Sequence, residues 1–376
     1  MATILSCRAE ATDPPVVTAA NDPALQHHEV RADRLPQPYA TRSSGNPPSV
    51  TARPAGAALH LPPRFHIAVW ADKLQDPRQM ILAPNGDVFV SEPGAGKIEV
   101  FRDANRDGIP ERRAIFAAGL NQPFGLAFRG GFLYVGSEDA IVRFPYVDGQ
   151  TAAKGEAERI APLPTGGHST RNVLFNRAGS KMYVAIGSGS NVSAEQPPRA
   201  SIIEYNPDGS AGRVFASGLR NPVGLAWESS TGALWTAVNE RDGLGDDLVP
   251  DFVTEVRDGG FYGWPFSYLG QHEEPRRKGE RPDLVKKAIV PSLLIQAHSA
   301  PLGLTFYNGT MFPAAYRGNA FVALHGSWNR TLRTGYKVIR VPMRNGKPSG
   351  GYDDFLTGWM TDPTGPAFDS ARRALE

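Results

Sequence analysis

Polar residues at four positions stand just ahead of short apolar runs along this chain. His168 precedes "STRNVLF" and Gln122 precedes "PFGLAF". Arg220 and Asn221 precede "PVGLAW", and His298 precedes "SAPLGLTF". An imidazole that titrates near pH 6.5 can accept a proton at neutral pH, and guanidinium and amide groups bind anions and carbonyls. If the fold brings the four positions together, they indicate a polar pocket with a general base.

The stretch "LPTGGHSTRNVLF" (163–175) leaves two interpretations of His168 open. A single histidine at a turn is usually a solvated polar residue. Alternatively, His168 is a general base, and Gly166 and Gly167 let a ligand approach the backbone closely. The recurrence of polar residues at one position in four repeats favours the second interpretation.

An internal repeat contains the elements that would position these residues. "DPRQMILAPNGDVFVSE" (76–92) and "NPVGLAWESSTGALWTAVNE" (221–240) share a proline, a short apolar strand, a glycine-containing turn and a second strand. The six repeats are marked by Pro77, Pro123, Thr170, Pro222, Pro301 and Pro363. The first two intervals between markers are 46 and 47 residues. Such spacing is typical of propeller blades with four antiparallel strands.

The predicted fold is therefore an all-β, six-bladed β-propeller over residues 61–376. Residues 1–60 are rich in Pro, Ala, Ser and Thr without periodicity, which predicts an extended or disordered N-terminal arm. Longer intervals between the later markers predict insertions around 240–298 and 325–360. Only 14 residues follow from Pro363, whereas a blade needs about 20–25 strand residues. We therefore expect an incomplete last blade. Either the arm supplies the missing strands, or the ring stays open with an unpaired strand edge.

The composition limits the classes of partner. A net charge of +2, with 41% hydrophobic and 21% charged residues, describes a globular protein and gives no reason to expect nucleic acid or a membrane surface. No apolar run reaches the ~18–20 residues of a transmembrane segment. The single cysteine excludes a disulfide framework or a cysteine-based metal cluster. No export signal is visible in "MATILSCRAEATDPP".

Two acidic stretches raise the question of further calcium sites. "DANRDGIPE" (103–111) has the offsets of the start of a calcium loop, with Asp103, Asn105, Asp107 and Gly108. The twelfth position is Ala114 instead of a bidentate acid, so a hairpin turn is an equal alternative. For Asp246 and Asp247 a solvated loop is favoured over a structural calcium site.

Longer motifs carry a resemblance to a known family. "GLRNPVGLAW", followed by "NERDGLGDDLVPDFVTEVRDGGFYGWP", resembles the soluble quinoprotein glucose/sorbosone dehydrogenases. "GLNQPFGLAF", "FLYVGSEDAIVRFPY" and "HGSWNRTLRTGYKVIRVP" are similar to the sorbosone dehydrogenase branch. The resemblance implies a six-bladed propeller that binds pyrroloquinoline quinone and calcium. It also implies a small-molecule sugar as substrate, an external electron acceptor and a periplasmic or extracytoplasmic location.

The resemblance also implies roles for individual residues. His168 matches the general base, which takes the proton of the sugar's C1 hydroxyl or hydrate while hydride passes to the quinone. The implied quinone contacts are Arg220, Asn221, Gln122 and Arg330, the last from "GSWNR". Glu240 and Arg241 align with the loop whose main-chain carbonyls hold the cofactor calcium.

One departure from the family pattern keeps other functions open. The strongly active dehydrogenases place an acidic residue beside the base, where this chain has Gly167, so no adjacent carboxylate orients His168. Together with the incomplete last blade, this leaves a catalytically impaired propeller that acts as a binding module as an alternative. A calcium-assisted lactonase or other propeller hydrolase ranks last, because that chemistry gathers carboxylates and asparagine on the axis.

Overall fold

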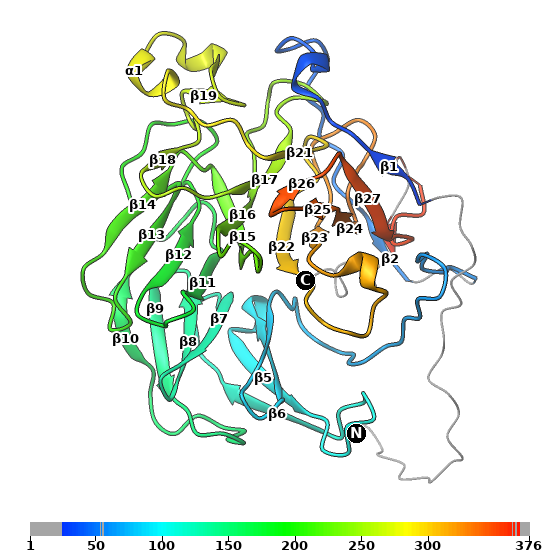
Figure 1. Cartoon of the computed structure of the whole chain (residues 1–376), viewed down its shortest axis with the longest axis vertical. Coiled ribbons are helices and arrows are strands. Elements are labelled where there is room, and N and C mark those ends of the chain that lie inside the picture. The colour runs from blue at the N-terminus through cyan, green and yellow to red at the C-terminus, as the bar shows by residue number, and fades with distance from the viewer. Residues whose placement is uncertain (1–24, 53, 55, 363, 365–366, 369–376) are drawn as a thin grey trace.

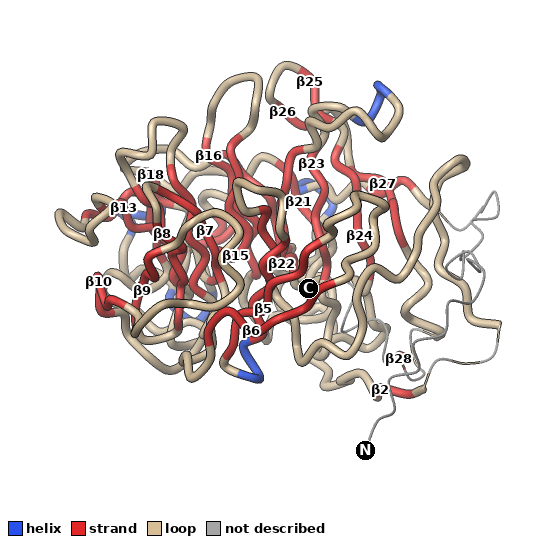
Figure 2. Tube along the Cα trace, turned by 90° about the horizontal axis from the view of Figure 1, so that it is seen from below, coloured by secondary structure: helices blue, strands red, loops and turns tan. Residues whose placement is uncertain are grey.

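The computed structural model describes residues 25–52, 54, 56–362, 364 and 367–368. Five β-sheets follow one another around a common centre (Figure 1), and loops join the strands at both ends (Figure 2). Among the described residues the only α-helix is α1 (Pro282–Val285). None of the helices in this part of the chain has the length and apolar character needed to cross a membrane.

Each of the five sheets is a blade whose strands pair in an antiparallel meander. Blade 1 contains β3 (Met80–Leu82), β4 (Val88–Glu92), β5 (Lys97–Arg102) and β6 (Arg112–Ala117). Blade 2 contains β7 (Gly125–Arg129), β8 (Phe132–Ser137), β9 (Ala140–Pro145) and β10 (Glu158–Pro162). Blade 3 contains β11 (Arg171–Phe175), β12 (Met182–Ile186), β13 (Ser201–Tyr205) and β14 (Arg213–Ser217), and β18 (Gly260–Phe261) joins its edge in parallel.

The last two blades carry the insertions that the repeat spacing predicts. Blade 4 contains β15 (Asn221–Trp227), β16 (Leu234–Asn239), β17 (Asp251–Glu255) and β21 (Leu293–Ile295), and β18, β19 (Ser267–Tyr268), β20 (His272–Glu273) and α1 intervene between β17 and β21. Blade 5 contains β22 (Pro301–Phe306), β23 (Ala320–Leu324), β24 (Lys337–Val341) and β27 (Tyr352–Leu356). The small hairpin of β25 (Met343–Arg344) and β26 (Lys347–Pro348) precedes β27. Single 3-10 turns lie at Ala32–Arg34, Pro93–Ala95, Pro275–Arg277 and Ala314–Tyr316.

The described residues form five blades, so the prediction of six is wrong. The first five repeat markers do stand at or just before β3, β7, β11, β15 and β22. Of the sixth repeat the structure describes one strand, β28 (Ala367–Phe368), which pairs in parallel with β2 (Val50–Thr51) from the arm. Two strands of two residues cannot make a blade of four antiparallel strands, because they bury too little surface and satisfy too few backbone groups.

The described part of the N-terminal arm is mostly extended and lies against blade 5. Its strand β1 (His27–His28) pairs with β27 and adds a fifth strand to that sheet. Farther along, His60 bridges to Thr357. Residues 1–24 lie outside the described part of the chain, and the boundary at residue 60 stays a prediction.

Apolar layers between successive blades form the core. Phe89 of blade 1 and Leu133 of blade 2 belong to one such layer, and three further layers separate blades 2 to 5. Beyond blade 5 there is no further four-stranded sheet among the described residues, and its free face packs on Leu61 and Phe65, which directly follow the arm. An extended segment thus covers surface that a sixth blade would otherwise bury.

Blade 1 has a less complete cover on its corresponding face. Trp70 packs on Phe101 at the outer part of the sheet, with ring centroids 5.2 Å apart. At the inner strand, Met80 and Leu82 remain 65% and 66% exposed. Within the described residues the ring has no four-stranded sheet between blades 5 and 1, where Figure 1 shows mainly loops and the short strand β2.

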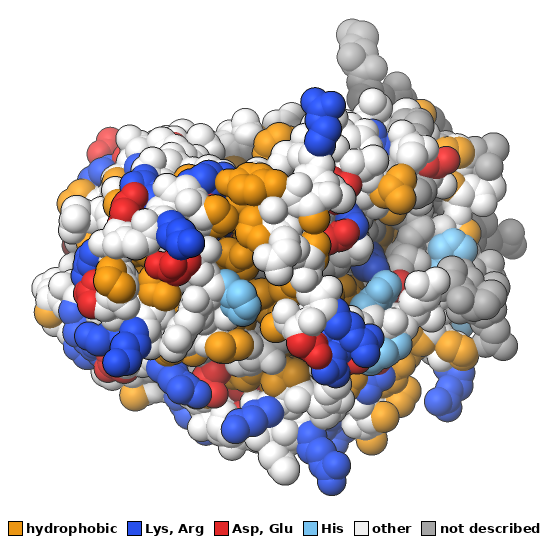
Figure 3. All heavy atoms as spheres, turned by 90° about the horizontal axis from the view of Figure 1, so that it is seen from above, with side chains coloured by type: hydrophobic (Ala, Val, Ile, Leu, Met, Phe, Trp, Pro, Cys, Tyr) orange, Lys and Arg blue, Asp and Glu red, His pale blue; other side chains and the backbone are white. Residues whose placement is uncertain are grey.

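Glycines allow the inner strands to approach one another. A Cβ on Gly125 would lie 2.5 Å from the carbonyl oxygen of Arg171, and one on Gly224 would lie 2.8 Å from that of Leu302. No side chain fits at those separations, which explains why glycine recurs after the marker proline in "QPFGLAF" and "NPVGLAW". On the surface, Figure 3 shows hydrophobic side chains gathered in a patch bordered by charges of both signs, in keeping with the net charge of +2.

Candidate cofactor site

His168 is held in one tautomer by the backbone of the neighbouring strand connection. Its Nδ1 lies 2.8 Å from the carbonyl oxygen of Ser188, and its backbone N–H donates to the same oxygen at 3.0 Å. A carbonyl oxygen can only accept, so Nδ1 carries the proton and Nε2 of the neutral ring is the acceptor. Burial, followed by the charge of Arg220, lowers the pKa of His168 to about 4. The imidazole is therefore neutral at pH 7.

Gly167 is required by its surroundings. Its φ is +73°, and a Cβ there would lie 2.4 Å from Cα of Gly189 and 2.7 Å from the Ser188 carbonyl oxygen. An acidic residue cannot occupy this position without moving the backbone. The protein's own chain, and not a ligand, thus makes the close approach to Gly167. The Ser188 carbonyl orients His168 in place of an adjacent carboxylate.

Arg171 fixes the loop that carries His168. Its guanidinium is fully buried and donates to four carbonyl oxygens, those of His168 (2.6 Å), Thr170 (2.9 Å), Pro164 (2.6 Å) and Glu138 (3.1 Å). A guanidinium group carries five N–H donors in a fixed planar geometry, which suits contact with several carbonyl oxygens at once. Arg171 starts β11 two residues after Ser169 and lies within the stretch singled out for His168, but its position in the sequence does not reveal its inward orientation.

Arg220 lies at the start of blade 4, next to the His168 loop. Its carbonyl oxygen accepts from the Ser188 backbone N–H at 2.7 Å, so Ser188 contacts both residues. Arg220 is 7% exposed, and its guanidinium donates to the Glu240 carbonyl oxygen at 2.8 Å and to Asp242 Oδ2 at 3.0 Å. Its Nε is buried and has no hydrogen-bond partner. The structure thus brings His168 and Arg220 together.

Asn221 and Gln122 lie on either side of this pair. The Asn221 amide is buried and contacts Asn239 Oδ1 and the Thr170 hydroxyl, both at 3.4 Å. Gln122 is exposed, has a φ of +45°, and donates to Glu138 Oε2 at 3.4 Å. Glu138 in turn accepts from the Gly166 backbone N–H at 2.8 Å. Gln122 therefore reaches the His168 loop only through Glu138.

The side chains of Glu240 and Arg241 face the core. Arg241 is fully buried, and its Nε donates to Glu240 Oε2 at 2.9 Å. It also donates to the Ser267 carbonyl oxygen at 2.7 Å. The carbonyl oxygen of Glu240 points instead to Arg220. The side chains of Glu240 and Arg241 are therefore engaged within the core, and a role of their main-chain carbonyls in holding a metal stays a prediction.

Asp242 is the carboxylate that faces this site, and the sequence analysis missed it. Besides Arg220 it accepts from the Asn329 amide, with Nδ2 2.6 Å from Oδ1. His298 Nδ1 lies 3.6 Å from the same oxygen. Burial opposes the charge of Asp242, but His298 and Arg220 outweigh it and lower the pKa of Asp242. The signal that could have identified Asp242 from the sequence is its place two residues after Glu240, which aligns with the family's calcium loop.

His298, at the start of blade 5, has a different environment. Its Nε2 donates to the Gly245 carbonyl oxygen at 3.0 Å, and Nδ1 lies 3.2 Å from Asn329 Nδ2. Burial disfavours its charged form, but Asp242 and the Gly245 carbonyl outweigh burial and raise the pKa of His298. Asp251 lies behind it, fully buried, and burial raises the pKa of Asp251 to about 7.

Arg330 is tied to the loop after blade 4. Its Nη2 donates to Asp247, and Asp246 accepts from the Thr331 backbone N–H at 3.1 Å. Both aspartates therefore join loops of the protein. The Nε of Arg330 is buried and unpartnered, so a further contact of this arginine with an anion stays a prediction.

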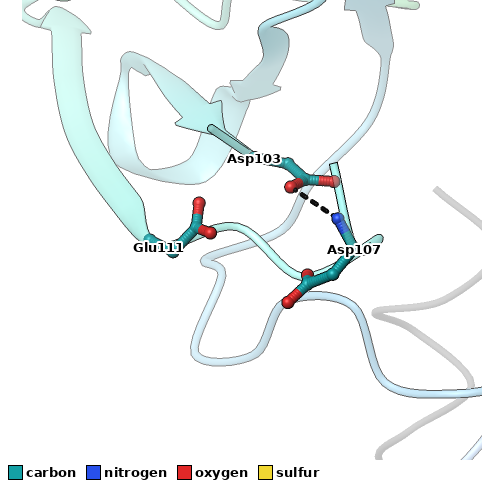
Figure 4. Close-up of side chains that lie close together, drawn as sticks. All are labelled: Asp103, Asp107 and Glu111. Atoms are coloured by element: carbon teal, nitrogen blue, oxygen red, sulfur yellow. Dashed lines mark hydrogen bonds between the residues drawn. The ribbon is translucent and has the colours of Figure 1, made fainter. Parts of the chain in front are cut away.

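The acidic loop at 103–111 forms a compact turn away from these residues. Figure 4 shows Asp103, Asp107 and Glu111, whose carboxylates lie within 4.8 Å of one another. Asp103 accepts from the backbone N–H groups of Asp107 (3.2 Å) and Gly108 (2.8 Å), and Glu111 accepts from that of Ala104 (2.7 Å). These bonds are the ones that stabilise a hairpin turn.

The donor set at blades 3 and 4 fits an anionic quinone and calcium. A buried N–H without a partner is costly, and Arg220 Nε is such a donor beside a neutral imidazole. A carboxylate or quinone oxygen would satisfy it with a charge-assisted bond. Asp242 and the main-chain carbonyl of Glu240 offer oxygen atoms of the kind that calcium prefers.

Known proteins share this fold and sequence pattern. A structure of the pyrroloquinoline quinone domain of pyranose dehydrogenase from Coprinopsis cinerea, in holo form, has a TM-score of 0.70 at 22% identity over 87% of this chain and 92% of that one. A calcium structure of a Trichoderma reesei enzyme of carbohydrate-active family AA12 has a TM-score of 0.67 at 20% identity, over 86% and 91% of the two chains. Both likenesses concern the fold.

Sequence relatives include characterised and uncharacterised proteins. The chain is 25% identical over 325 residues to the pyrroloquinoline quinone-dependent pyranose dehydrogenase of Coprinopsis cinerea, which covers 74% of this chain and only 44% of that enzyme. It is 26% identical over 331 residues to an uncharacterised protein of Borreliella burgdorferi, covering 83% and 84% of the two. The sorbosone dehydrogenase branch stays a prediction. A model of the family described as TrAA12-like matches residues 59–250 and 277–356, most of the chain, and the protein therefore belongs to the TrAA12-like family.

Proposed function

We propose that this protein oxidises an aldose or sorbosone-type sugar with bound pyrroloquinoline quinone and calcium, and passes the electrons to an external acceptor. The observation that carries the proposal is the pairing of a neutral imidazole, His168, with Arg220, whose buried Nε–H lacks a partner. Family membership and the pyranose dehydrogenase relative support the same chemistry.

The residues around His168 would handle the substrate proton. Nε2 accepts the proton of the sugar's C1 hydroxyl, because Nδ1–H is already bonded to the Ser188 carbonyl. That carbonyl and Arg171 hold the ring and its loop in place during the transfer. A pKa of about 4 makes His168 a weak base, so efficient transfer requires that the hydroxyl become more acidic when it is bound.

The residues of blades 4 and 5 would bind the cofactor. The chemistry that the bound group supplies is hydride acceptance at a quinone carbonyl polarised by calcium. Arg220 Nε and the Asn221 amide bind its anionic and carbonyl oxygens, with Gln122 and Arg330 farther out. Asp242 and the main-chain carbonyls of residues 240–241 would hold the calcium, since a carbonyl oxygen that already accepts from Arg220 keeps a second lone pair.

Titration of the purified protein with pyrroloquinoline quinone and calcium tests this function. We expect the quinone absorbance to shift at one equivalent and to bleach when a substrate sugar is added. Binding without bleaching by any of a panel of aldoses and sorbosone would favour the binding-module alternative. Absence of binding to the folded protein with calcium present would refute the proposal.

The resemblance also leads us to propose a periplasmic or extracytoplasmic location. The quinone and its electron acceptors would be available there. Fractionation of the native host with an antibody against the protein tests this, and recovery in the cytosolic fraction would contradict it.

A further inference from the structure

A short segment of the N-terminal arm crosses the rim of the candidate site. We call residues 39–47 the rim strap. It contacts the loop at 242–247, which follows β16, and the loop at 326–335, which follows β23. Most of the strap is solvent-exposed, so burial of apolar surface does not explain its position.

The strap binds the 242–247 loop at two points. The Tyr39 backbone N–H donates to the Leu244 carbonyl oxygen, and the Asp246 backbone N–H donates to the Thr41 hydroxyl, both at 2.8 Å. Between them Gly245 has a φ of +117°, and a Cβ there would lie 2.8 Å from Thr41 Oγ1. The strap and this loop therefore fit closely, backbone against backbone.

Asn46 binds the 326–335 loop with all four of its polar groups. Its backbone N–H donates to the Trp328 carbonyl oxygen at 2.7 Å, and its Nδ2 donates to that of Thr331 at 2.9 Å. Arg333 donates to the Asn46 carbonyl oxygen at 3.0 Å and to Asn46 Oδ1 at 2.8 Å. A residue whose backbone and side-chain groups all bond to one loop holds that loop in one geometry.

The two loops carry the groups that surround Asp242. Gly245, between the two strap contacts, accepts from His298 through its carbonyl oxygen. Asn329, next to Trp328, donates to Asp242. The strap contacts at Leu244, Asp246 and Trp328 are therefore each within one residue of Gly245 or Asn329, whereas the contact with Arg333 lies farther along the second loop. Since both loops are otherwise long connections, their ordering carries an entropic cost that the strap reduces before a ligand arrives.

We propose that the rim strap is a positioning element of the cofactor site. Asn46 and Thr41 set the spacing of the two loops, so that Asn329 binds Asp242 and Asp242 stays beside Arg220. This inference rests on the proposed function for its ligand, but the ordering of the loops is a property of the protein alone.

Four variants test the strap. Asn46→Ala removes the two side-chain bonds, and Thr41→Val removes the hydroxyl acceptor that Thr41→Ser retains. Arg31→Ala is the matched control, because this exposed arginine of the same arm pairs with Asp33 and Glu29 and not with either loop. For each protein, hydrogen–deuterium exchange of the quinone-free form is followed over 242–247 and 326–335. The Kd for pyrroloquinoline quinone with calcium and the unfolding Tm are measured as well.

The exchange data separate the strap from the proposed function. We expect faster exchange confined to the two loops in Asn46→Ala and Thr41→Val, with about a tenfold weaker Kd, as the loss of one or two hydrogen bonds implies. Thr41→Ser and Arg31→Ala should match the unaltered protein. Unchanged exchange of the two loops would overturn the proposed role of the strap. Faster exchange with an unchanged Kd would overturn it as well. If the unaltered protein binds no quinone, the proposed function fails, and the exchange experiment alone decides whether the strap orders the loops.

Discussion

His168 and His298 occupy equivalent positions at the starts of the inner strands of blades 3 and 5, yet their environments have opposite effects. His168 has a carbonyl partner and a nearby arginine, and its pKa falls to about 4. His298 lies beside Asp242, and its pKa rises. One imidazole is held neutral, and the other is drawn toward the charged form.

The difference shows that the partner, and not the position in the repeat, decides the chemistry. Both histidines donate one N–H to a backbone carbonyl, from Nδ1 in His168 and from Nε2 in His298. The remaining nitrogen of His298 faces Asn329 and Asp242. That of His168 is the acceptor of a neutral ring. We therefore propose His168, which is neutral at pH 7, as the group that takes the substrate proton, whereas His298 supports the charge of Asp242.

Replacing His168 should give the largest effect. For His168→Gln we expect kcat to fall by about 10²–10⁴-fold, the usual contribution of a general base, with the quinone Kd nearly unchanged. Steady-state kinetics with a saturating electron acceptor, together with a quinone titration, measure the two quantities. A parallel loss of turnover and of quinone affinity would contradict the role of His168 as base.

His298→Gln is the matched comparison for His168→Gln. Because His298 contacts Asp242 and not the reacting proton, we expect it to weaken quinone binding by a few-fold and to change kcat much less than His168→Gln. Equal losses of kcat in the two variants would remove the distinction between the two histidines.

Arg220 connects the two environments, and its replacement should come next in size. Arg220→Met removes a charge-assisted contact worth about 1.5–3 kcal/mol, so the quinone Kd should rise by about 10–100-fold. Because the charge of Arg220 lowers the pKa of His168, that pKa should rise in the variant. Absorbance titration and NMR of the histidine ring in the quinone-free protein measure the two effects. An unchanged His168 pKa would show that burial alone sets it.

Asp242→Asn should act mainly on His298. The carboxylate raises the pKa of His298, so its neutral replacement should lower that pKa and weaken calcium-dependent quinone binding by a few-fold. NMR titration of both histidines measures this. A shift of the His168 signal as large as that of His298 would contradict the separation of the two sites.

The repeat pattern predicts the blades well, because each blade carries its own strands and turns. Pro77, Pro123 and Pro222 mark the starts of the inner strands, and the insertions lie where the spacing lengthens. The prediction of a sixth blade is wrong because a single marker, Pro363, predicts the start of one strand but not the partner strands that would make a sheet. Pairing of β28 with a strand of the arm depends on contacts more than 300 residues apart, which a local pattern cannot show.

The sequence predicts where the candidate site lies, but it predicts the orientations of the side chains less well. His168, Arg220 and Asn221 converge because the repeat places them at one end of adjacent inner strands. The inward turn of Arg241, the bond between Arg330 and Asp247, and the role of Asp242 depend on loop conformations. The resemblance identifies Glu240 and Arg241 but not Asp242, the carboxylate that contacts Arg220.

The smallest expected effect concerns the pH dependence of stability. The two histidines should contribute to it with opposite signs. The pKa of His168 in the folded protein, about 4, is below the ordinary 6.5. Between these values the unfolded chain binds more protons, so His168 makes the protein less stable as pH falls through that window. The raised pKa of His298 stabilises the folded protein below pH 6.5, and this contribution is lost as pH rises through the folded value.

Thermal unfolding of the quinone-free protein between pH 4.5 and 8 measures both contributions. His168→Gln should reduce the loss of stability at acid pH, so that Tm depends less on pH below pH 6.5. His298→Gln should instead make Tm depend less on pH above 6.5. Expected Tm changes are small, since about 1 kcal/mol shifts Tm by only about 1–2 °C in a protein of 376 residues. If both variants flattened the same limb, the two imidazoles would share one electrostatic environment, and the contrast between them would not hold.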